Sequence, residues 1–368
     1  MSVSYGGSSI TFEDGSIVSS GSAGFKNKII NGAMMIDQRN AGASYSAVDG
    51  GFSVDRWKVA SYDSSAQTGK FTVQQSSTVP TGFSKSLLVT SSAATSLGSG
   101  AIYWIGQFIE GFNTADLDFG LATAKTVTLS FWVRSSLTGT FAGSILNNGN
   151  DRSYPFTYTI NSANTFEYKT VTITGDTSGT WPTDSSIGLR VLFNLGQGST
   201  YSRTANTWAS GYYGSVTGTT NLLATSGATL YITGVQLEKG TTASSFEFRS
   251  YGKELMLCQR YFQKSFNQSL AVGATGSLSG AINLIIYVTN GEYTSIPVQL
   301  SPQMRATPTI TWYSYVNGAT GKLVVSGTNY DVDVQTGYYS ESRIYFAWAA
   351  NATGNRQILG HYTASAEL

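Results

Sequence analysis

The sequence predicts a mainly β protein, and three observations lead to that prediction. Charged residues make up 12% of the 368 residues, about half of the ~25% usual in globular domains, while glycine reaches 41 and tyrosine 22. Aromatic residues make up 13%, which argues against an intrinsically disordered chain. Short segments of alternating apolar and polar residues recur between turn-forming residues such as Asp49-Gly50-Gly51. We expect an N-terminal arm, a jelly-roll-like β-sandwich, one connecting α-helix and a small antiparallel β C-terminal domain.

Residues 1–27 are expected to form the arm. The segment is rich in serine and glycine, and it is too short to hold a hydrophobic core of its own. Its strand-like piece, Ile10–Val18, places Asp14-Gly15 between two apolar runs, as in a β-hairpin. A floppy tail and a tether to a larger particle are the two interpretations, and we favour the tether.

Residues 28–249 are expected to form the sandwich. In Thr126–Val133 the side chains of Val127, Leu129, Phe131 and Val133 point to one side of the strand, with polar residues between them. One dry and one wet face is what a sandwich of two sheets requires. The expected strands are Arg56–Ala60, Lys70–Gln75, Ser86–Thr90, Ala101–Phe108, Thr126–Val133, Phe156–Ile160, Tyr168–Ile173, Ile187–Leu195 and Thr229–Leu237.

Residues 250–265 are expected to form the connecting helix. Tyr251, Leu255, Cys258 and Phe262 recur at steps of four and three residues, which is the pattern of one helix face. Ser250 stands where a helix N-cap is expected. The change from strand-like to helical periodicity therefore separates the sandwich from the part that follows.

The apolar face of this helix is the candidate contact between copies of the chain, through Leu255, Cys258 and Phe262. Either the rest of its own chain or partner helices near a three-fold axis would cover that face, and the sequence leaves both open. Cys258 is the only cysteine, which excludes an intrachain disulfide. We expect it to be a buried, inert thiol.

Residues 266–368 are expected to form the C-terminal β domain, the candidate tip of the molecule. Its prolines Pro297, Pro302 and Pro308 fall at strand ends or edges, where a missing N–H matters least. The domain is dense in tyrosine and tryptophan. The expected strands are Ala281–Thr289, Thr294–Leu300, Thr309–Tyr315, Lys322–Val325, Tyr330–Val334 and Arg343–Ala350.

Charge and hydropathy exclude several classes of partner. The net charge is +1, and lysine and arginine do not cluster, so a nucleic-acid partner is not expected. No stretch approaches the ~20 apolar residues of a membrane span, and the N-terminus has no apolar run typical of a signal peptide. We expect a protein that is synthesised in a cytoplasm and does not insert into a membrane.

Catalytic chemistry is thinly represented. His361 is the only histidine, and phosphate-binding, nucleophile-elbow and zinc motifs are absent from the sequence. We therefore expect no catalytic residue, no metal and no cofactor, although a glycosidase needs only two suitably spaced carboxylates. Solvated turns or calcium ligands are the other interpretations of such acidic pairs. The pairs are Glu13 and Asp14, Asp116 and Asp118, and Asp331 and Asp333.

Exposed aromatic residues are the candidate ligand contacts, because a sugar ring presents C–H groups that stack on an aromatic face. Trp57 and Trp132 lie within expected strands and are interpreted as packing residues. The candidates are Trp208, Tyr212 and Tyr213 in the glycine-flanked stretch NTWASGYYGSVTG, and Trp312, Tyr338 and Tyr339 in the C-terminal domain. With these aromatic residues, the expected sandwich resembles carbohydrate-binding modules.

Several longer stretches resemble bacteriophage tail-fibre and receptor-binding virion proteins. They are KNKIINGAMMIDQRNAG with FSVDRWKV, GVQLEKG with SSFEFRSYGKELMLCQRYF, VQLSPQMRATPTITWYS, and GHYTASAEL. They extend from Lys26 to Leu368. The resemblance implies a homotrimeric virion fibre protein whose arm, residues 1–27, attaches to a phage tail or capsid protein and which binds a host cell-surface glycan or protein.

Three functional hypotheses follow. The first is a receptor-binding tail fibre, which places the protein in the virion, on the tail rather than the capsid. The second is a capsid fibre or decoration protein with a structural role. The third is a glycan depolymerase, which would require one of the acidic pairs to act on sugar.

Overall fold

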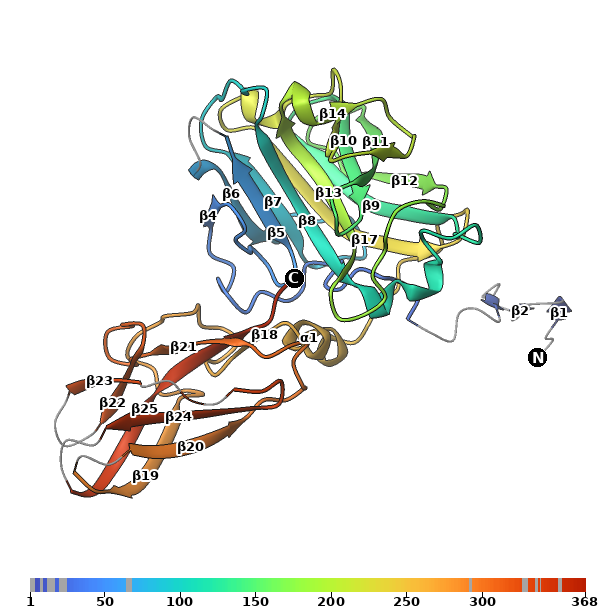
Figure 1. Ribbon diagram of the computed structural model, residues 1–368. Coiled ribbons are helices and arrows are strands. Elements are labelled where there is room, and N and C mark those ends of the chain that lie inside the picture. Colours follow the sequence, from blue (N-terminus) through green and yellow to red (C-terminus); the bar gives the residue numbers. More distant parts are fainter. Residues whose placement is uncertain are drawn as a thin grey trace.

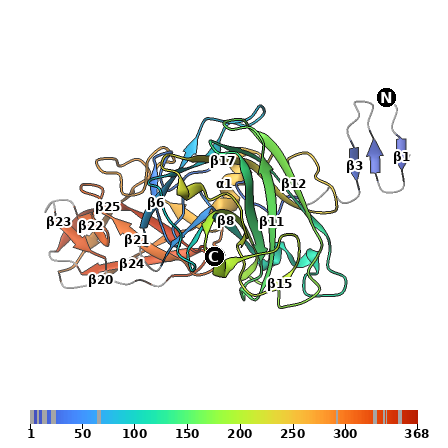
Figure 2. The same cartoon turned by 90° about the horizontal axis from the view of Figure 1, so that it is seen from above.

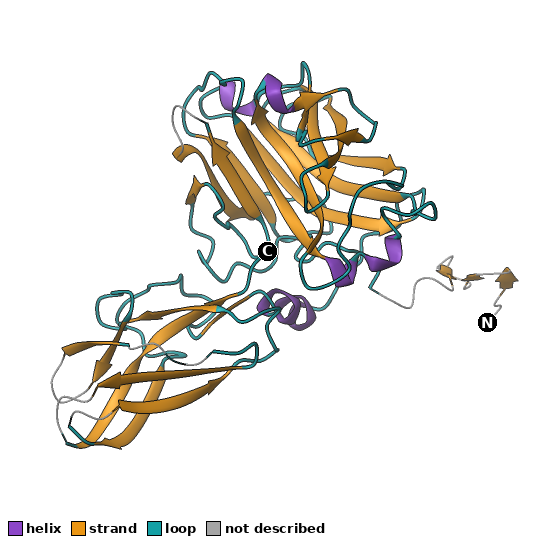
Figure 3. Ribbon diagram, in the orientation of Figure 1, coloured by secondary structure: helices purple, strands orange, loops and turns teal. Residues whose placement is uncertain are grey.

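The computed structural model describes residues 4–6, 9–11, 17–19, 25–63, 68–290, 293–325, 330–334, 337, 339–349 and 353–368. Within these residues the chain is mainly β, with several antiparallel sheets and one α-helix, as the sequence predicts (Figure 3). The jelly-roll-like sandwich and the C-terminal sheets lie side by side, and the helix lies between them (Figures 1 and 2).

The arm contains three short antiparallel strands, β1 (Ser4–Gly6), β2 (Ser9–Thr11) and β3 (Ile17–Ser19). β2 pairs with β3 through Thr11 and Ile17, as the predicted hairpin requires. Asp14 and Gly15, the predicted turn, lie outside the described residues, and so does the acidic pair Glu13 and Asp14.

Two six-stranded antiparallel sheets form the sandwich. The first, here the front sheet, has in spatial order β15 (Ala209–Ser210), β11 (Arg152–Ile160), β10 (Gly139–Leu146), β13 (Ile187–Gln197), β8 (Ile102–Glu110) and β5 (Lys58–Tyr62). The second, the back sheet, has β12 (Glu167–Ile173), β9 (Val127–Ser135), β17 (Thr229–Lys239), β7 (Ser86–Ser91), β6 (Thr68–Ser76) and β4 (Tyr45–Val48). Short elements join them: β14 (Ser202–Arg203), β16 (Ser215–Val216), and the 3₁₀ turns η1 (Gly111–Asn113), η2 (Ala115–Leu117), η3 (Ser199–Tyr201) and η4 (Leu222–Ala224).

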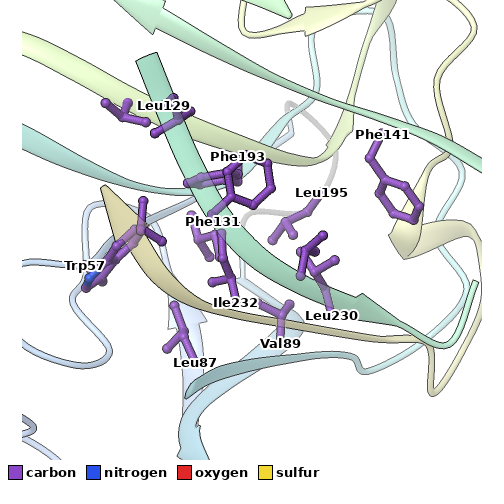
Figure 4. Packing of buried hydrophobic residues seen from close by; sticks show 14 of the residues in the cluster. Trp57, Leu87, Val89, Leu129, Phe131, Phe141, Phe193, Leu195, Leu230 and Ile232 are labelled. Carbon is purple, nitrogen blue, oxygen red and sulfur yellow. The ribbon is translucent and has the colours of Figure 1, made fainter. Parts of the chain in front are cut away.

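The core lies between the facing surfaces of these sheets (Figure 4). The alternating residues of β9 behave as predicted, because Val127, Leu129, Phe131 and Val133 are all fully buried. Phe193 reaches Phe131 from the opposite sheet, with ring centroids 4.9 Å apart and nearly perpendicular planes. Trp57 is also fully buried and donates from Nε1 to the Asn31 carbonyl oxygen at 3.1 Å, which confirms its interpretation as a packing residue.

The expected strands omit β4, β10 and the two-residue strands β14, β15 and β16. β10 is central in the front sheet, where it pairs with β11 and β13. Its Gly143 interrupts the apolar pattern for a steric reason: a Cβ at this position would lie 2.4 Å from the Phe156 ring and 2.5 Å from the Leu192 carbonyl oxygen. Because the two neighbouring strands pack so closely here, only glycine fits, and the alternation of apolar side chains by which a strand is predicted is interrupted.

The connecting helix is shorter than predicted. α1 spans Tyr251–Gln259, and Phe262 instead begins the strand β18 (Phe262–Lys264). Ser250 stands at the N-cap position, but its side chain makes no capping hydrogen bond. The expectation that Phe262 belongs to the apolar face of the helix is therefore wrong, because the chain has already changed to strand geometry there.

Residues near the start of the sandwich cover the inner face of α1. Cys258 and Tyr261 are fully buried in a small cluster with Ile30 and Ile36, and Leu255 packs against its edge. Burial raises the pKa of the Cys258 thiol well above its usual value, consistent with an inert thiol. Of the candidate contacts between copies, Cys258 and Phe262 are thus buried within their own chain, and Leu255 is partly buried.

The C-terminal domain is organised around β25 (Gly354–Ser365), which pairs with four other strands. These are β18, β19 (Ile282–Val288), β21 (Thr309–Tyr313) and β22 (Lys322–Val325), and β22 continues to β23 (Tyr330–Asp333). β20 (Tyr293–Gln299) and β24 (Arg343–Ala349) form a separate two-stranded sheet. The described strands β19 to β24 match the predicted ones, whereas β25 was not expected.

Gly360 explains part of that omission. A Cβ at Gly360 would lie 2.3 Å from the Leu323 side chain and 2.9 Å from the Tyr313 carbonyl oxygen. β25, which pairs with four other strands, therefore carries a glycine where the neighbouring chain segments pack closest to it. Ile358, Tyr362 and Ala364 of the same strand face the core of this domain.

A cluster of charged residues, here called the junction, joins the two parts. Glu367, after β25, accepts hydrogen bonds from Arg39 at 2.9 Å and from Arg56, both in the sandwich part of the chain. Arg56 is only 2% exposed, and its guanidinium lies 3.5 Å from the centre of the Tyr261 ring. Glu110 of β8 accepts from Arg260 Nη2 at 2.6 Å.

Asp55 lies beside this junction and is fully buried. Its Oδ1 accepts from the Gln38 N–H at 3.1 Å and from Arg39 Nη1 at 3.3 Å, and Gln38 Nε2 donates to Oδ2. Burial raises the pKa of Asp55 to about 6, although Arg39 and the hydrogen bonds oppose that shift and Glu367 adds to it.

Candidate functional site

The outer surface of the front sheet, which faces away from the core, gathers aromatic and polar side chains. Strand pairing places Ile102 of β8 between Tyr62 of β5 and Gln197 of β13. One row further, Trp104 pairs with Asn194 of β13. Since residues two apart along a strand share a face, these side chains lie on one surface. Tyr62 is its clearest exposed aromatic residue, at 40%.

The loop between β14 and β16 folds onto this surface. Trp104 Nε1 donates to the Tyr212 hydroxyl at 3.0 Å, and the rings of Tyr201 and Tyr212 meet edge to face with centroids 5.4 Å apart. Trp104 is thereby only 8% exposed. Burial raises the pKa of Tyr212 to about 12. Tyr201 and Tyr212 stay partly exposed. Where the loop covers Trp104, the aromatic side chains that reach solvent are therefore tyrosines.

Tyr213 lies on the same loop. Arg203 Nη1 donates to its hydroxyl at 2.9 Å, and the guanidinium lies 4.9 Å from the ring centre. The ring also lies close to Gly211, where a Cβ would come within 3.2 Å of it. Tyr213 is therefore fixed in position and half-buried, with Arg203 exposed beside it.

A pocket of about 190 Å³ opens beside this loop, and we call it the hydroxyl pocket. Three amide side chains line it, from Asn194, Gln197 and Asn221. Its hydroxyl groups come from Ser199, Ser202, Ser215, Thr217, Thr219 and Thr220, and Leu97 and Val216 add apolar surface. None of the described residues that line it carries a charge.

Cations mark the other end of the same surface. Lys58 Nζ and the Arg190 guanidinium each lie 4.7 Å from the centre of the Phe108 ring. Lys58 donates to the Leu368 carbonyl oxygen at 3.1 Å, and Arg190 donates to the Asn148 carbonyl oxygen at 3.0 Å. Burial lowers the pKa of Lys58, and Arg190 lowers it further. This end is therefore charged, in contrast to the hydroxyl pocket.

Trp208 lies in a different place from Tyr212 and Tyr213. It packs against Phe119, Tyr154 and Trp181, with ring centroids 5.9, 5.2 and 5.6 Å away. Its Nε1 donates to the Thr174 carbonyl oxygen at 2.7 Å. The structure thus brings Tyr212 and Tyr213 together and places Trp208 in an aromatic cluster at the edge of the core.

The two described C-terminal candidates, Trp312 and Tyr339, pack against the core of their domain. Trp312 is only 4% exposed and packs against Tyr362, so it is a packing residue and not a ligand contact. Tyr339 packs against the same core and forms a β-bridge with Ile344. Tyr338 lies outside the described residues.

Tyr62, Tyr201 and the hydroxyl pocket were not predicted from the sequence. The sequence could have indicated Tyr62. It lies two and four residues after Ala60 and Lys58 on the same strand, so all three side chains point to the outer surface. The pocket has no local sequence pattern, since it joins the segments 194–202 and 215–221 with Leu97. Serine and threonine are common throughout this chain, and only the fold selects these.

The described side chains of the acidic pairs contact lysines. Asp116 accepts from Lys28 Nζ at 2.7 Å and lies 3.4 Å from Lys239 Nζ. Asp118 faces Lys125 at 3.6 Å. Asp333 faces Lys322 at 2.6 Å, and the side chain of Asp331 is not among those described. His361 is buried, and its ring stacks on Phe266 with centroids 4.0 Å apart.

Two further findings concern metal ligands and membrane spans in the described part of the chain. No three histidine, cysteine, aspartate or glutamate side chains gather there in a way that would suit a metal ion. No helix there is long and apolar enough to cross a membrane.

A second, apolar pocket of about 240 Å³ lies on another part of the surface, next to the root of the arm. Its aromatic lining comprises Phe83, Phe246, Phe248 and Tyr251. The Phe83 ring lies 5.3 Å from Phe246 and 5.2 Å from Phe248. Phe248 is 64% exposed, and Tyr251 of α1 is also exposed. We call these four residues the aromatic patch.

Comparisons with known proteins give structural similarities of low score. No protein-family model matches the chain, and no curated protein matches it. One similar structure is a bacteriophage CBA120 tailspike protein 4 enzymatically active domain (15% identity, TM-score 0.29, 58% of this chain and 21% of that chain). Another is a putative sugar binding protein from Bacteroides thetaiotaomicron (14%, TM-score 0.33, 58% and 100%). A third is a family 11 carbohydrate-binding module from Clostridium thermocellum in complex with a mixed-linked tetrasaccharide (15%, TM-score 0.28, 54% and 98%).

The matched region spans only about a fifth of the tailspike chain. TM-scores at this level do not define a family, a ligand or an activity.

Proposed function

We propose that this chain is a virion fibre protein that binds a host cell-surface glycan through the outer surface of the front sheet. It acts as a homotrimer, and residues 1–27 tether it to a tail protein. The sequence resemblance to phage tail-fibre proteins supports the virion role. The observation that supports glycan binding is the tyrosine surface of Tyr62, Tyr201 and Tyr212 beside an uncharged hydroxyl pocket.

The chemistry of this surface suits a carbohydrate. Sugar hydroxyls pair with amide and hydroxyl side chains, while the C–H face of the ring packs on an aromatic side chain. Here both kinds of group lie on one sheet surface, in neighbouring rows of the strand pairing. A single shallow site of this kind binds weakly, and three copies on one fibre raise the avidity through effective concentration.

Replacing Tyr62 by alanine is expected to lower glycan affinity about tenfold, or about 1.4 kcal/mol. The expected reason is loss of the exposed ring on which a sugar stacks. Binding of the purified protein to host envelope polysaccharide, measured by biolayer interferometry, tests this. Tyr168→Ala is the matched control, because Tyr168 is 44% exposed but lies on β12 of the back sheet. Equal losses in both variants would contradict the assignment to the front sheet.

For the trimer contact we propose the aromatic patch in place of the buried Cys258 and Phe262. Large exposed aromatic groups that lie together are typical of protein–protein contacts. The patch includes Tyr251, an exposed residue in the first turn of α1, so it keeps the predicted helix in the interface through a residue that its own chain does not bury.

Replacing Phe248 by aspartate is therefore expected to convert a trimer into monomers at micromolar concentration, since a charge would be buried in the contact. Light scattering measures the solution mass directly. Phe112→Asp is the control, because Phe112 is similarly exposed, at 61%, but lies on η1. A wild-type protein that is already a monomer would refute the homotrimer.

A further inference from the structure

We propose that the hydroxyl pocket is a subsite for one uncharged sugar unit and determines that the recognised glycan is neutral at this position. The inference rests on the proposed glycan-binding function and deepens it by naming the class of ligand. It concerns a place in the fold that the aromatic residues of the sequence did not indicate.

The elements around the pocket hold its polar groups in fixed positions. β14 and β16 pair through Ser202 and Ser215, both of which line the pocket. Thr219 Oγ1 donates to the Val216 carbonyl oxygen at 2.8 Å, and the Asn221 carboxamide oxygen accepts from the Leu223 N–H at 3.0 Å. The pocket walls are thus held by hydrogen bonds of their own, and the lining is preorganised.

Gln197 lies where the sheet surface meets the pocket. Its Oε1 accepts from Asn194 Nδ2 at 2.9 Å, which fixes its carboxamide in position. Asn194 and Gln197 both line the pocket. Carboxamides of this kind both donate to and accept from hydroxyl groups, so the pair suits a sugar.

Size and charge define the ligand class. About 190 Å³ is below the ~300–1,000 Å³ typical of pockets for drug-sized ligands, so the pocket suits one ring rather than an oligosaccharide. Among the described lining residues no cation is present to pair with a carboxylate or a phosphate. A charged sugar would lose its hydration there without compensation, whereas a neutral hydroxyl-rich ring would find amide and hydroxyl partners.

The position of the pocket gives the subsite its role. Gln197 and Tyr62 flank Ile102 on neighbouring strands, so a ring that stacks on Tyr62 has its next unit near the pocket. The cations Lys58 and Arg190 lie toward the opposite end of the sheet surface. The two ends therefore differ in the charge that they accept.

The experiment uses the full-length chain and saturation-transfer NMR with single sugars as probes. The neutral probes are glucose, galactose, mannose, rhamnose and N-acetylglucosamine, and the acidic probes are glucuronic and galacturonic acid. We expect at least one neutral sugar to bind, and each uronic acid to bind at least tenfold more weakly than its neutral counterpart. Ser199→Trp, at an exposed residue of the lining, is expected to weaken the neutral sugar at least tenfold.

Thr200→Trp is the matched control, because Thr200 is the exposed neighbour of Ser199 but does not line the pocket. It is expected to bind as the wild type does. Equal binding by Ser199→Trp and wild type, or uronic acids that bind as tightly as neutral sugars, would overturn the pocket assignment. If polysaccharide binding then still depends on Tyr62, the proposed function stands without the subsite. If the wild type binds neither single sugars nor polysaccharide, both proposals fail.

Discussion

Replacing Arg56 by methionine is expected to lower the free energy of unfolding by about 3–5 kcal/mol, the range found when one partner of a buried ion pair is removed. The Arg56 guanidinium is almost fully buried, lies over Tyr261, and donates to the Glu367 carboxylate and to the Phe108 carbonyl oxygen. Methionine has a similar volume but leaves both acceptors without this donor. In the variant, Glu367 still accepts a hydrogen bond from Arg39, so the loss of unfolding free energy is not expected to exceed this range.

Urea denaturation followed by tryptophan fluorescence measures this loss. Lys322→Met is the control, since it breaks an exposed pair with Asp333 and is expected to change stability by less than about 1 kcal/mol. A change of that small size in Arg56→Met would mean that the junction does not stabilise the fold. Because Arg56 connects the sandwich to the segment after β25, the variant is also expected to separate the unfolding of the two parts.

Asp55 is expected to make the free energy of unfolding fall by about 3 kcal/mol as the pH rises from below the unfolded pKa of this group to above its folded pKa. Each unit of pKa difference corresponds to about 1.4 kcal/mol. Its pKa is raised from 3.8 to about 6 in the folded protein, first by burial. Between these values the folded state holds a proton that the unfolded state has released. Stability from this group is therefore complete below pH 3.8, declines with rising pH, and is lost above pH 6.

Asp55→Asn isolates this effect, because asparagine does not titrate. The difference in unfolding free energy between the variant and the wild type is expected to shift by about 2–3 kcal/mol in favour of the variant from pH 4 to pH 7. Comparing the two proteins cancels groups with the opposite behaviour, such as Glu167, whose pKa is lowered to about 2. Parallel stability curves would show that folding does not raise the pKa of Asp55.

The fold was predictable wherever side-chain alternation was intact. Val127 to Val133 of β9 shows this, because every second residue is buried as the pattern requires. The prediction failed where packing itself demanded glycine, at Gly143 in β10 and Gly360 in β25. In both strands the neighbouring chain leaves no room for a side chain at the glycine. The apolar residue that would have completed the alternating pattern of a strand is therefore absent.

The candidate site was predictable only in part, and for a related reason. The glycines around Tyr212 and Tyr213 correctly indicated a loop with aromatic residues, but the sequence could not tell that Tyr212 folds back onto Trp104. Trp208, from the same stretch, is directed to another cluster by its bond to Thr174. Which aromatic residues stay exposed depends on tertiary contacts, which leave no local pattern.

The place of β25 in the chain has a consequence for biosynthesis. β18, β19, β21 and β22 all leave the ribosome before the strand with which they pair. About a hundred residues separate β18 from the end of β25, so β18 waits roughly 5–20 s at a translation rate of about 5–20 residues per second. During that interval the nascent chain carries strands with open edges, which invite pairing with neighbouring polypeptides. On a polysome that makes many copies at once, each copy can pair these strands within its own chain only after residues 354–365 have been synthesised.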